Sequence, residues 1–158
     1  MQIRVTRRLF FVAVPGLILA VLAIVASICA LSPSPEMKSL LWLPRSLASW
    51  ADLQPTFRNF PAFGAISLFA TLFAHGLFRS VTVFCAVSVT LLVSVFSTIL
   101  EAMQLFIPSR YFEWADIGWS IAGAGAGTLV GILILSLPFC FLPEARGLPN
   151  KRLFQPIQ

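Results

Sequence analysis

Four long apolar segments, separated by short polar stretches, make up most of this sequence. They cover approximately residues 9–31, 60–78, 80–104 and 115–138. At about 1.5 Å per residue, a helix of roughly twenty residues spans the hydrocarbon layer of a bilayer, which is roughly 30 Å thick. Inside lipid a backbone must satisfy its own hydrogen bonds, and a continuous apolar run of this length does so as a helix. The sequence therefore predicts an all-α, polytopic membrane protein, a bundle of four transmembrane helices.

The composition argues against a soluble domain. Only 11% of the 158 residues are charged, 58% are hydrophobic, and the mean hydropathy is +0.91, whereas soluble domains carry about 25% charged residues. We expect one membrane domain over residues 1–158. The net charge of +5 lies in the segments that flank the apolar runs, without a nucleic-acid motif, so no nucleic-acid partner is expected. The three cysteines and one histidine show no ligand spacing, so neither a metal nor a cofactor is expected.

Residues 32–58 form the longest polar stretch between two apolar segments. It opens with Ser-Pro-Ser-Pro, which ends the first helix. Within residues 36–50, leucine and tryptophan recur at helical spacing. This pattern predicts a short helix that lies along the membrane interface and is kinked at Pro44. An irregular loop is the alternative.

Polar and ionisable side chains gather at the junction of the third and fourth apolar segments. Helical spacing places Thr90, Ser94 and Ser97 on one face, together with the two polar residues that follow them. Ionisable groups at a membrane boundary are costly, and they indicate a functional site. The candidate functional cluster consists of Glu101, Gln104, Arg110, Asp116 and Ser120.

The fourth apolar segment carries a stripe of small residues on one helix face. Gly123, Gly127 and Gly131 recur every fourth residue. Small residues at this spacing let two helix backbones approach closely within a membrane. We therefore expect these glycines to pack against another helix, either in the same chain or in a homo-oligomer that forms through the stripe.

The loop charges predict the orientation of the chain in the membrane. With four helices, both termini and the turn between the second and third helices share one side. That side carries Arg4, Arg7, Arg8, Arg79, Arg146, Lys151 and Arg152, and the other side carries Lys38, Arg45, Arg58 and Arg110. Lysine and arginine are enriched on the cytoplasmic side. We therefore expect cytoplasmic termini, including a cytoplasmic tail at 143–158, an external loop at 32–58 and a cluster that faces outward.

The cluster and the glycine stripe together form a pattern with defined spacing: Glu101-x-x-Gln104-x-Phe106-x-Pro108-x-Arg110-x-x-x-x-x-Asp116, then Gly123 and Gly127. This pattern resembles the VanZ-like family of bacterial membrane proteins, which is named for a protein associated with resistance to the glycopeptide teicoplanin. The resemblance implies a small helical protein of the bacterial cell envelope, in the cytoplasmic (inner) membrane.

Two positions depart from the pattern of that family. Ser120 stands where the family usually has Asn, four positions after the Asp. Asn59 stands where the early helix of the family often has His, and no Asp-Lys precedes it. A mechanism that needs those groups is therefore in question for this chain.

Three functions are compatible with the cluster. The first is a binding or structural protein of the cell envelope, with Arg110 paired to Glu101 or Asp116. Its cluster would either lock the third and fourth helices together or bind the headgroup of a membrane lipid or a lipid-linked cell-wall precursor, with Arg110 suited to a phosphate or carboxylate. The second is an enzyme acting on a lipid-linked envelope substrate, with Glu101 and Asp116 as acid and base. The third is a small oligomeric transporter. The sequence assigns no catalytic residue.

Overall fold

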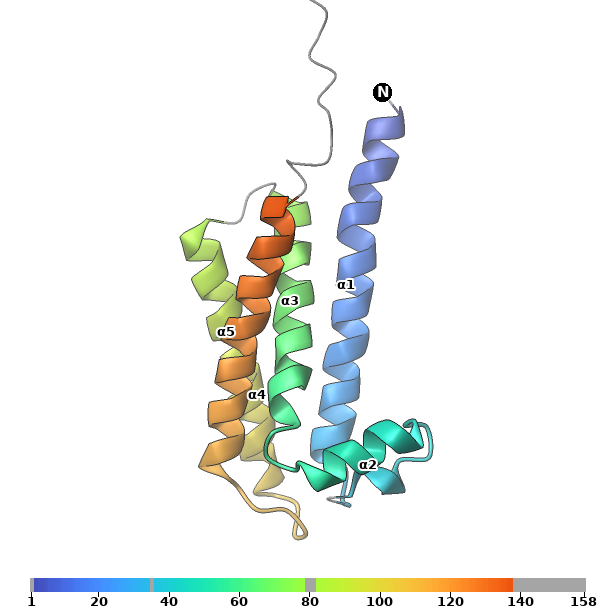
Figure 1. Ribbon diagram of the computed structural model, residues 1–158, viewed down its shortest axis with the longest axis vertical. Coiled ribbons are helices and arrows are strands. Elements are labelled where there is room, and N and C mark those ends of the chain that lie inside the picture. The colour runs from blue at the N-terminus through green and yellow to red at the C-terminus, as the bar shows by residue number, and fades with distance from the viewer. Residues whose placement is uncertain (1, 35, 79–81, 138–158) are drawn as a thin grey trace, which may run out of the picture.

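The computed structural model describes residues 2–34, 36–78 and 82–137, with side chains from Val12 onward. This part of the chain is helical and contains no strand (Figure 1). Four of its helices are long and apolar enough to cross a membrane. The predicted all-α fold with four such helices is confirmed, and the chain is a multi-pass membrane protein. The helices are α1 (Gln2–Leu31), the 3-10 helix η1 (Met37–Ser39), α2 (Arg45–Leu53), α3 (Asn59–Phe78), α4 (Val83–Gln104) and α5 (Trp114–Ser136).

The first helix is longer than the apolar run that predicted it. Helix α1 begins at Gln2 instead of near residue 9. An apolar run stops at the first charged residues, but glutamine and arginine are good helix formers, so the helix continues through them. Arg79 and the predicted tail at 143–158 lie outside the described residues.

The segment between α1 and α3 differs from the single kinked helix considered above. It contains two short helices, η1 and α2, and Pro44 is the N-cap of α2. Proline disfavours helical geometry in the residue before it, and it is tolerated at a helix start, so the helix begins after Pro44. The Asp52 carboxylate accepts hydrogen bonds from the backbone N–H groups of Met37 (2.6 Å) and Lys38 (3.3 Å), which holds η1 against α2.

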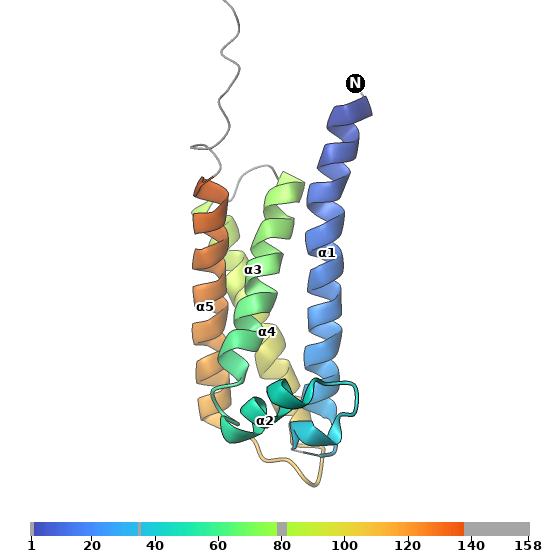
Figure 2. The same ribbon diagram turned by 45° about the vertical axis from the view of Figure 1, so that its right-hand side comes forward.

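Helix α3 lies in the middle of the bundle. It packs most extensively on α5 and also contacts α1 and α4, and α4 contacts α5 and α1. In Figures 1 and 2, α1 and α5 lie on opposite sides of α3, and α2 crosses the lower end of the bundle. The loop from α4 to α5 reaches the same end. The polar cluster of the sequence is therefore brought to the end of the bundle that carries α2.

The interface between α3 and α5 is a contact of two backbones. A Cβ atom added to Gly127 would overlap the carbonyl oxygen of Gly64, and one added to Gly123 would overlap that of Phe60. At Gly131 a Cβ atom would meet the side chain of Thr71 at 3.0 Å. The structure thus places the glycine stripe against α3 of the same chain. Association of two chains through this stripe stays a prediction.

Buried hydroxyl groups connect the three packed helices. The Thr128 hydroxyl of α5 lies 2.8 Å from that of Ser67 on α3 and 2.9 Å from that of Thr90 on α4. Lipid offers no hydrogen-bond partner, so polar side chains inside a membrane bond to one another or to the backbone. These hydrogen bonds fix the positions of α3, α4 and α5 relative to one another within an otherwise apolar core.

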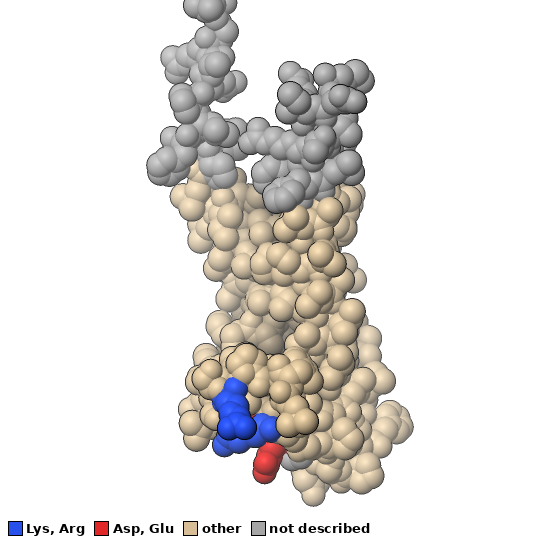
Figure 3. All heavy atoms as spheres, turned by 90° about the vertical axis from the view of Figure 1, so that its right-hand side faces the viewer, with Lys and Arg blue, Asp and Glu red and all other residues tan. Residues whose placement is uncertain are grey.

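The charged side chains of the described residues are concentrated at one end of the bundle. On the face drawn in Figure 3, the basic and acidic side chains of the described residues gather at the end that carries α2, and the described surface above them shows no charged side chain. Large apolar side chains such as Leu17, Leu92 and Leu133 are more than half exposed on the helices. This distribution matches a bundle whose long sides contact lipid.

We predict that Gly127→Ala destabilises the protein because the new methyl group separates α3 from α5. Overpacking of this kind costs about 1–3 kcal/mol, which exceeds the gain in helix propensity of about 1 kcal/mol from glycine to alanine. Gly125→Ala is the matched control, because a Cβ atom there meets nothing within 4 Å. Thermal unfolding in detergent measures the difference. Equal stability of the two variants would contradict the backbone contact.

Candidate functional site

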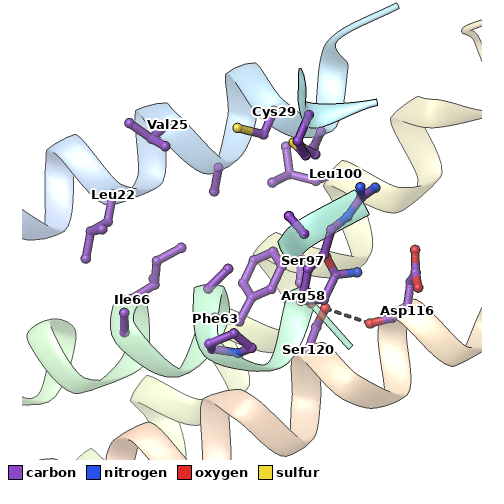
Figure 4. Close-up of a pocket in the computed structure, with 18 of the residues that line it drawn as sticks. Leu22, Val25, Cys29, Arg58, Phe63, Ile66, Ser97, Leu100, Asp116 and Ser120 are labelled. Atoms are coloured by element: carbon purple, nitrogen blue, oxygen red, sulfur yellow. Dashed lines mark hydrogen bonds between the residues drawn. The ribbon is translucent and has the colours of Figure 1, made fainter. Parts of the chain in front are cut away.

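An amphipathic cavity of about 500 Å³ opens at the end of the bundle that carries α2. Its apolar part lies between α1 and α3, where Leu22 and Val25 face Ile66 (Figure 4). Its polar part lies toward the start of α5, where Asp116 and Ser120 are found (Figure 4). The five predicted cluster residues all line this cavity. They are Glu101, Gln104, Arg110, Asp116 and Ser120.

Glu101 is buried at the end of α4, with 4% of its surface exposed. Its Oε1 atom accepts a hydrogen bond from the backbone N–H of Glu113 at 3.2 Å, and its Oε2 atom accepts one from Nε2 of Gln104 at 3.2 Å. Glu113 is the N-cap of α5. The carboxylate of Glu101 therefore fixes where α5 begins, and Gln104 holds that carboxylate in place.

Arg110 lies in the loop between α4 and α5 and caps the carboxyl end of α1. Its Nη2 donates to the carbonyl oxygens of Cys29 (3.1 Å) and Ser34 (3.2 Å), and its Nε donates to that of Ser32 (3.3 Å). The neighbouring Ser109 hydroxyl donates to the carbonyl of Pro33. A cation here also complements the negative end of the helix dipole. The loop is thereby attached to α1.

The hydrogen bonds of Arg110 thus differ from the carboxylate pairing hypothesised from the sequence. Burial lowers the pKa of Arg110 from its ordinary value, and the charge of Arg58 lowers it further, whereas Glu101 and Asp116 oppose this shift. The two carboxylates therefore act on Arg110 through space. Arginine keeps its proton in proteins, so the guanidinium remains charged at neutral pH.

Asp116, in the first turn of α5, is the member of the cluster with unused hydrogen-bonding capacity. The side chain of Asn59 is hydrogen-bonded to this carboxylate, but the Oδ1 atom is buried and has no hydrogen-bond partner among the described residues. The Ser120 hydroxyl donates to the backbone carbonyl of Asp116 at 2.7 Å, not to its carboxylate. A buried polar atom without a partner costs about 1–3 kcal/mol. Such an atom on the wall of a cavity is a candidate acceptor for a ligand.

Two polar residues of the cavity were not included in the sequence-based cluster. Asn59 is the first residue of α3 and Arg58 directly precedes it, and both line the polar part. The sequence feature that could have indicated Arg58 is its place directly before an apolar run, on the same predicted side of the membrane as the cluster. The rest of the wall comes from the interfacial segment, including Met37, Leu47 and Trp50.

Comparison with protein-family models, with curated proteins and with solved structures finds no match for this chain. Function is therefore inferred from the residues of the cavity and from their geometry.

We predict that Arg110→Gln lowers the stability of the protein, because the uncharged side chain cannot make the three bonds to the end of α1. Hydrogen bonds from charged groups contribute about 1.5–3 kcal/mol, and we expect a loss of this order. Arg45→Gln is the control, since Arg45 is exposed at the start of α2. Thermal unfolding, followed by tryptophan fluorescence, compares the two. Arg110→Gln as stable as Arg45→Gln would exclude the proposed cap.

Proposed function

We propose that this protein binds the headgroup of a membrane lipid, or of a lipid-linked cell-wall precursor, in the amphipathic cavity. The observation that carries this proposal is the polarity of the cavity. One part is lined by apolar side chains of α1 and α3, and the other by the polar cluster at the membrane boundary. A lipid has the same division between its hydrocarbon chain and its headgroup.

The polar part of the cavity offers two complementary contacts to such a headgroup. The buried Oδ1 of Asp116 needs a hydrogen-bond donor, which a hydroxyl or amino group supplies. The three bonds of Arg110 use Nε and Nη2, and Nη1 donates to no described residue. Guanidinium groups pair well with phosphate. The favoured headgroup therefore carries a phosphate together with a hydroxyl or amino group.

The resemblance to the VanZ-like family supports a place for this protein in the bacterial cell envelope. We propose that the chain is a VanZ-like protein of the cytoplasmic membrane and that its presence changes susceptibility to teicoplanin. The positive-inside rule favours cytoplasmic termini and an outward-facing cavity. Headgroups of lipid-linked cell-wall precursors, with their phosphates and sugar hydroxyls, match the contacts offered there.

Binding is better supported than acid–base catalysis at the same residues. Catalysis by two carboxylates requires both to face the substrate. Both oxygens of Glu101 instead accept hydrogen bonds from the protein itself. Asp116 is therefore left as the one carboxylate of the predicted pair that is offered to a ligand.

We predict that Asp116→Asn weakens binding of phosphatidylglycerol, whose headgroup has both a phosphate and hydroxyl groups. The amide oxygen of Asn still accepts a hydrogen bond but carries no charge. The difference between a charged and a neutral bond, about 1–1.5 kcal/mol, corresponds to a roughly 5- to 10-fold higher Kd. Native mass spectrometry of the purified protein with short-chain phosphatidylglycerol measures this ratio. Glu113→Gln removes an exposed carboxylate close by in the sequence, outside the cavity lining, and serves as the control.

The same pair of variants tests the proposal in cells. Asp116→Asn should reach the membrane at wild-type level and lose the effect of the protein on teicoplanin susceptibility, whereas Glu113→Gln should retain it. Wild-type affinity for phosphatidylglycerol in Asp116→Asn would refute the role of this carboxylate. An unchanged susceptibility on deletion of the protein would refute the link to teicoplanin.

A further inference from the structure

A second cavity, of about 440 Å³, lies farther along the bundle from the polar cluster; its lining is almost entirely apolar and includes exposed side chains such as Leu92. Helices α1, α3 and α4, which all contribute to the wall of the first cavity, also line this one. Its wall includes Leu19 and Ala23 of α1, Phe73 of α3, and Leu92 of α4. The hydroxyl of Ser88 and the thiol of Cys85 are the polar side-chain groups on its described lining.

The two cavities follow one another along all three helices. On α3 the amphipathic cavity ends at Ile66, and the apolar cavity begins at the same residue. On α1, Leu22 lines the first cavity and Leu19, one helical turn away, lines the second. The apolar cavity therefore continues the first one away from the polar cluster and into the membrane-spanning part of the bundle.

We propose that the apolar cavity holds the hydrocarbon chain of the lipid whose headgroup occupies the amphipathic cavity. This proposal rests on the function proposed above and narrows the ligand to a lipid with a long chain. Between Ile66 and Phe78, where the apolar cavity lies, α3 rises about 18 Å at about 1.5 Å per residue. That length is more than half of the roughly 30 Å hydrocarbon layer.

The chemistry of the apolar cavity favours a hydrocarbon chain as its occupant. A headgroup or water molecule there would lose its hydrogen bonds, because the lining is apolar and the surroundings are lipid. A flexible chain that is already attached to a bound headgroup loses no hydrogen bond and fills the space by packing. The two cavities together form one groove between α1, α3 and α4, and this groove is a single binding site with a polar and an apolar end.

Photo-crosslinking with two forms of phosphatidylglycerol tests this proposal in nanodiscs. One form carries a diazirine next to the glycerol, and the other carries it at the end of an acyl chain. We expect the first to label the region of Leu22 and Phe63, and the second to label the region of Phe73 and of the buried Val89, which lines the same cavity. Labelling of the second region should exceed labelling of the lipid-facing residues Leu129 and Leu133 several-fold.

Ala23→Phe should fill the apolar cavity and abolish specific labelling by the chain-end probe, while labelling by the glycerol probe stays at the wild-type level. Ser88→Phe fills it from α4 and serves as the second variant if Ala23→Phe does not fold. Chain-end labelling spread evenly over lipid-facing residues, with Asp116-dependent labelling by the glycerol probe, would overturn this inference alone. Labelling by neither probe above background would overturn the proposed function as well. Crosslinks to a second copy of the chain would assign the apolar cavity to a dimer instead.

Discussion

The structure depends on one constraint, which is that lipid cannot satisfy a polar group. The loop between α4 and α5 brings several such groups to the membrane boundary, and nearly all of them find partners within the chain. Glu101 accepts the N–H of Glu113 and so fixes the start of α5. Arg110 donates to carbonyls at the end of α1. These bonds connect α1, α4 and α5 at the end of the bundle that carries α2. That connection shapes the amphipathic cavity.

The same constraint separates the structural residues of the cluster from the ligand-binding one. Glu101, Gln104 and Arg110 use their charges and amide to hold helix ends, so their substitution acts first on folding. Asp116 keeps a buried carboxylate oxygen without a partner among the described residues. This unpaired oxygen costs free energy in the ligand-free protein. Because it lies on the wall of a cavity, a ligand that donates a hydrogen bond to it explains the cost best. Substitution of Asp116 should therefore reduce ligand binding, whereas substitution of Arg110 should reduce the stability of the fold.

The four long helices could be predicted because their length is set by the thickness of the bilayer, and the glycine spacing indicated close helix packing. The interfacial segment was predicted less well, since a leucine pattern does not show that Pro44 starts α2 instead of bending a longer helix. The cluster residues were predicted as a group, but their roles were not. Arg110 bonds to carbonyls 76 to 81 residues away in the chain, and such partners leave no local pattern. Arg58 stands directly before an apolar run, but only the fold shows that it lines the cavity.

The most direct measurement is a structure of the protein in nanodiscs made from bacterial membrane lipids, at a resolution that shows bound lipid. We predict one lipid in the groove that the two cavities form between α1, α3 and α4. Its phosphate lies near Nη1 of Arg110, and a hydroxyl or amino group of the headgroup lies about 3 Å from Oδ1 of Asp116. Its hydrocarbon chain passes Ile66 into the apolar cavity. An empty or collapsed groove, with Oδ1 of Asp116 bonded to a donor of the protein itself, would contradict this interpretation.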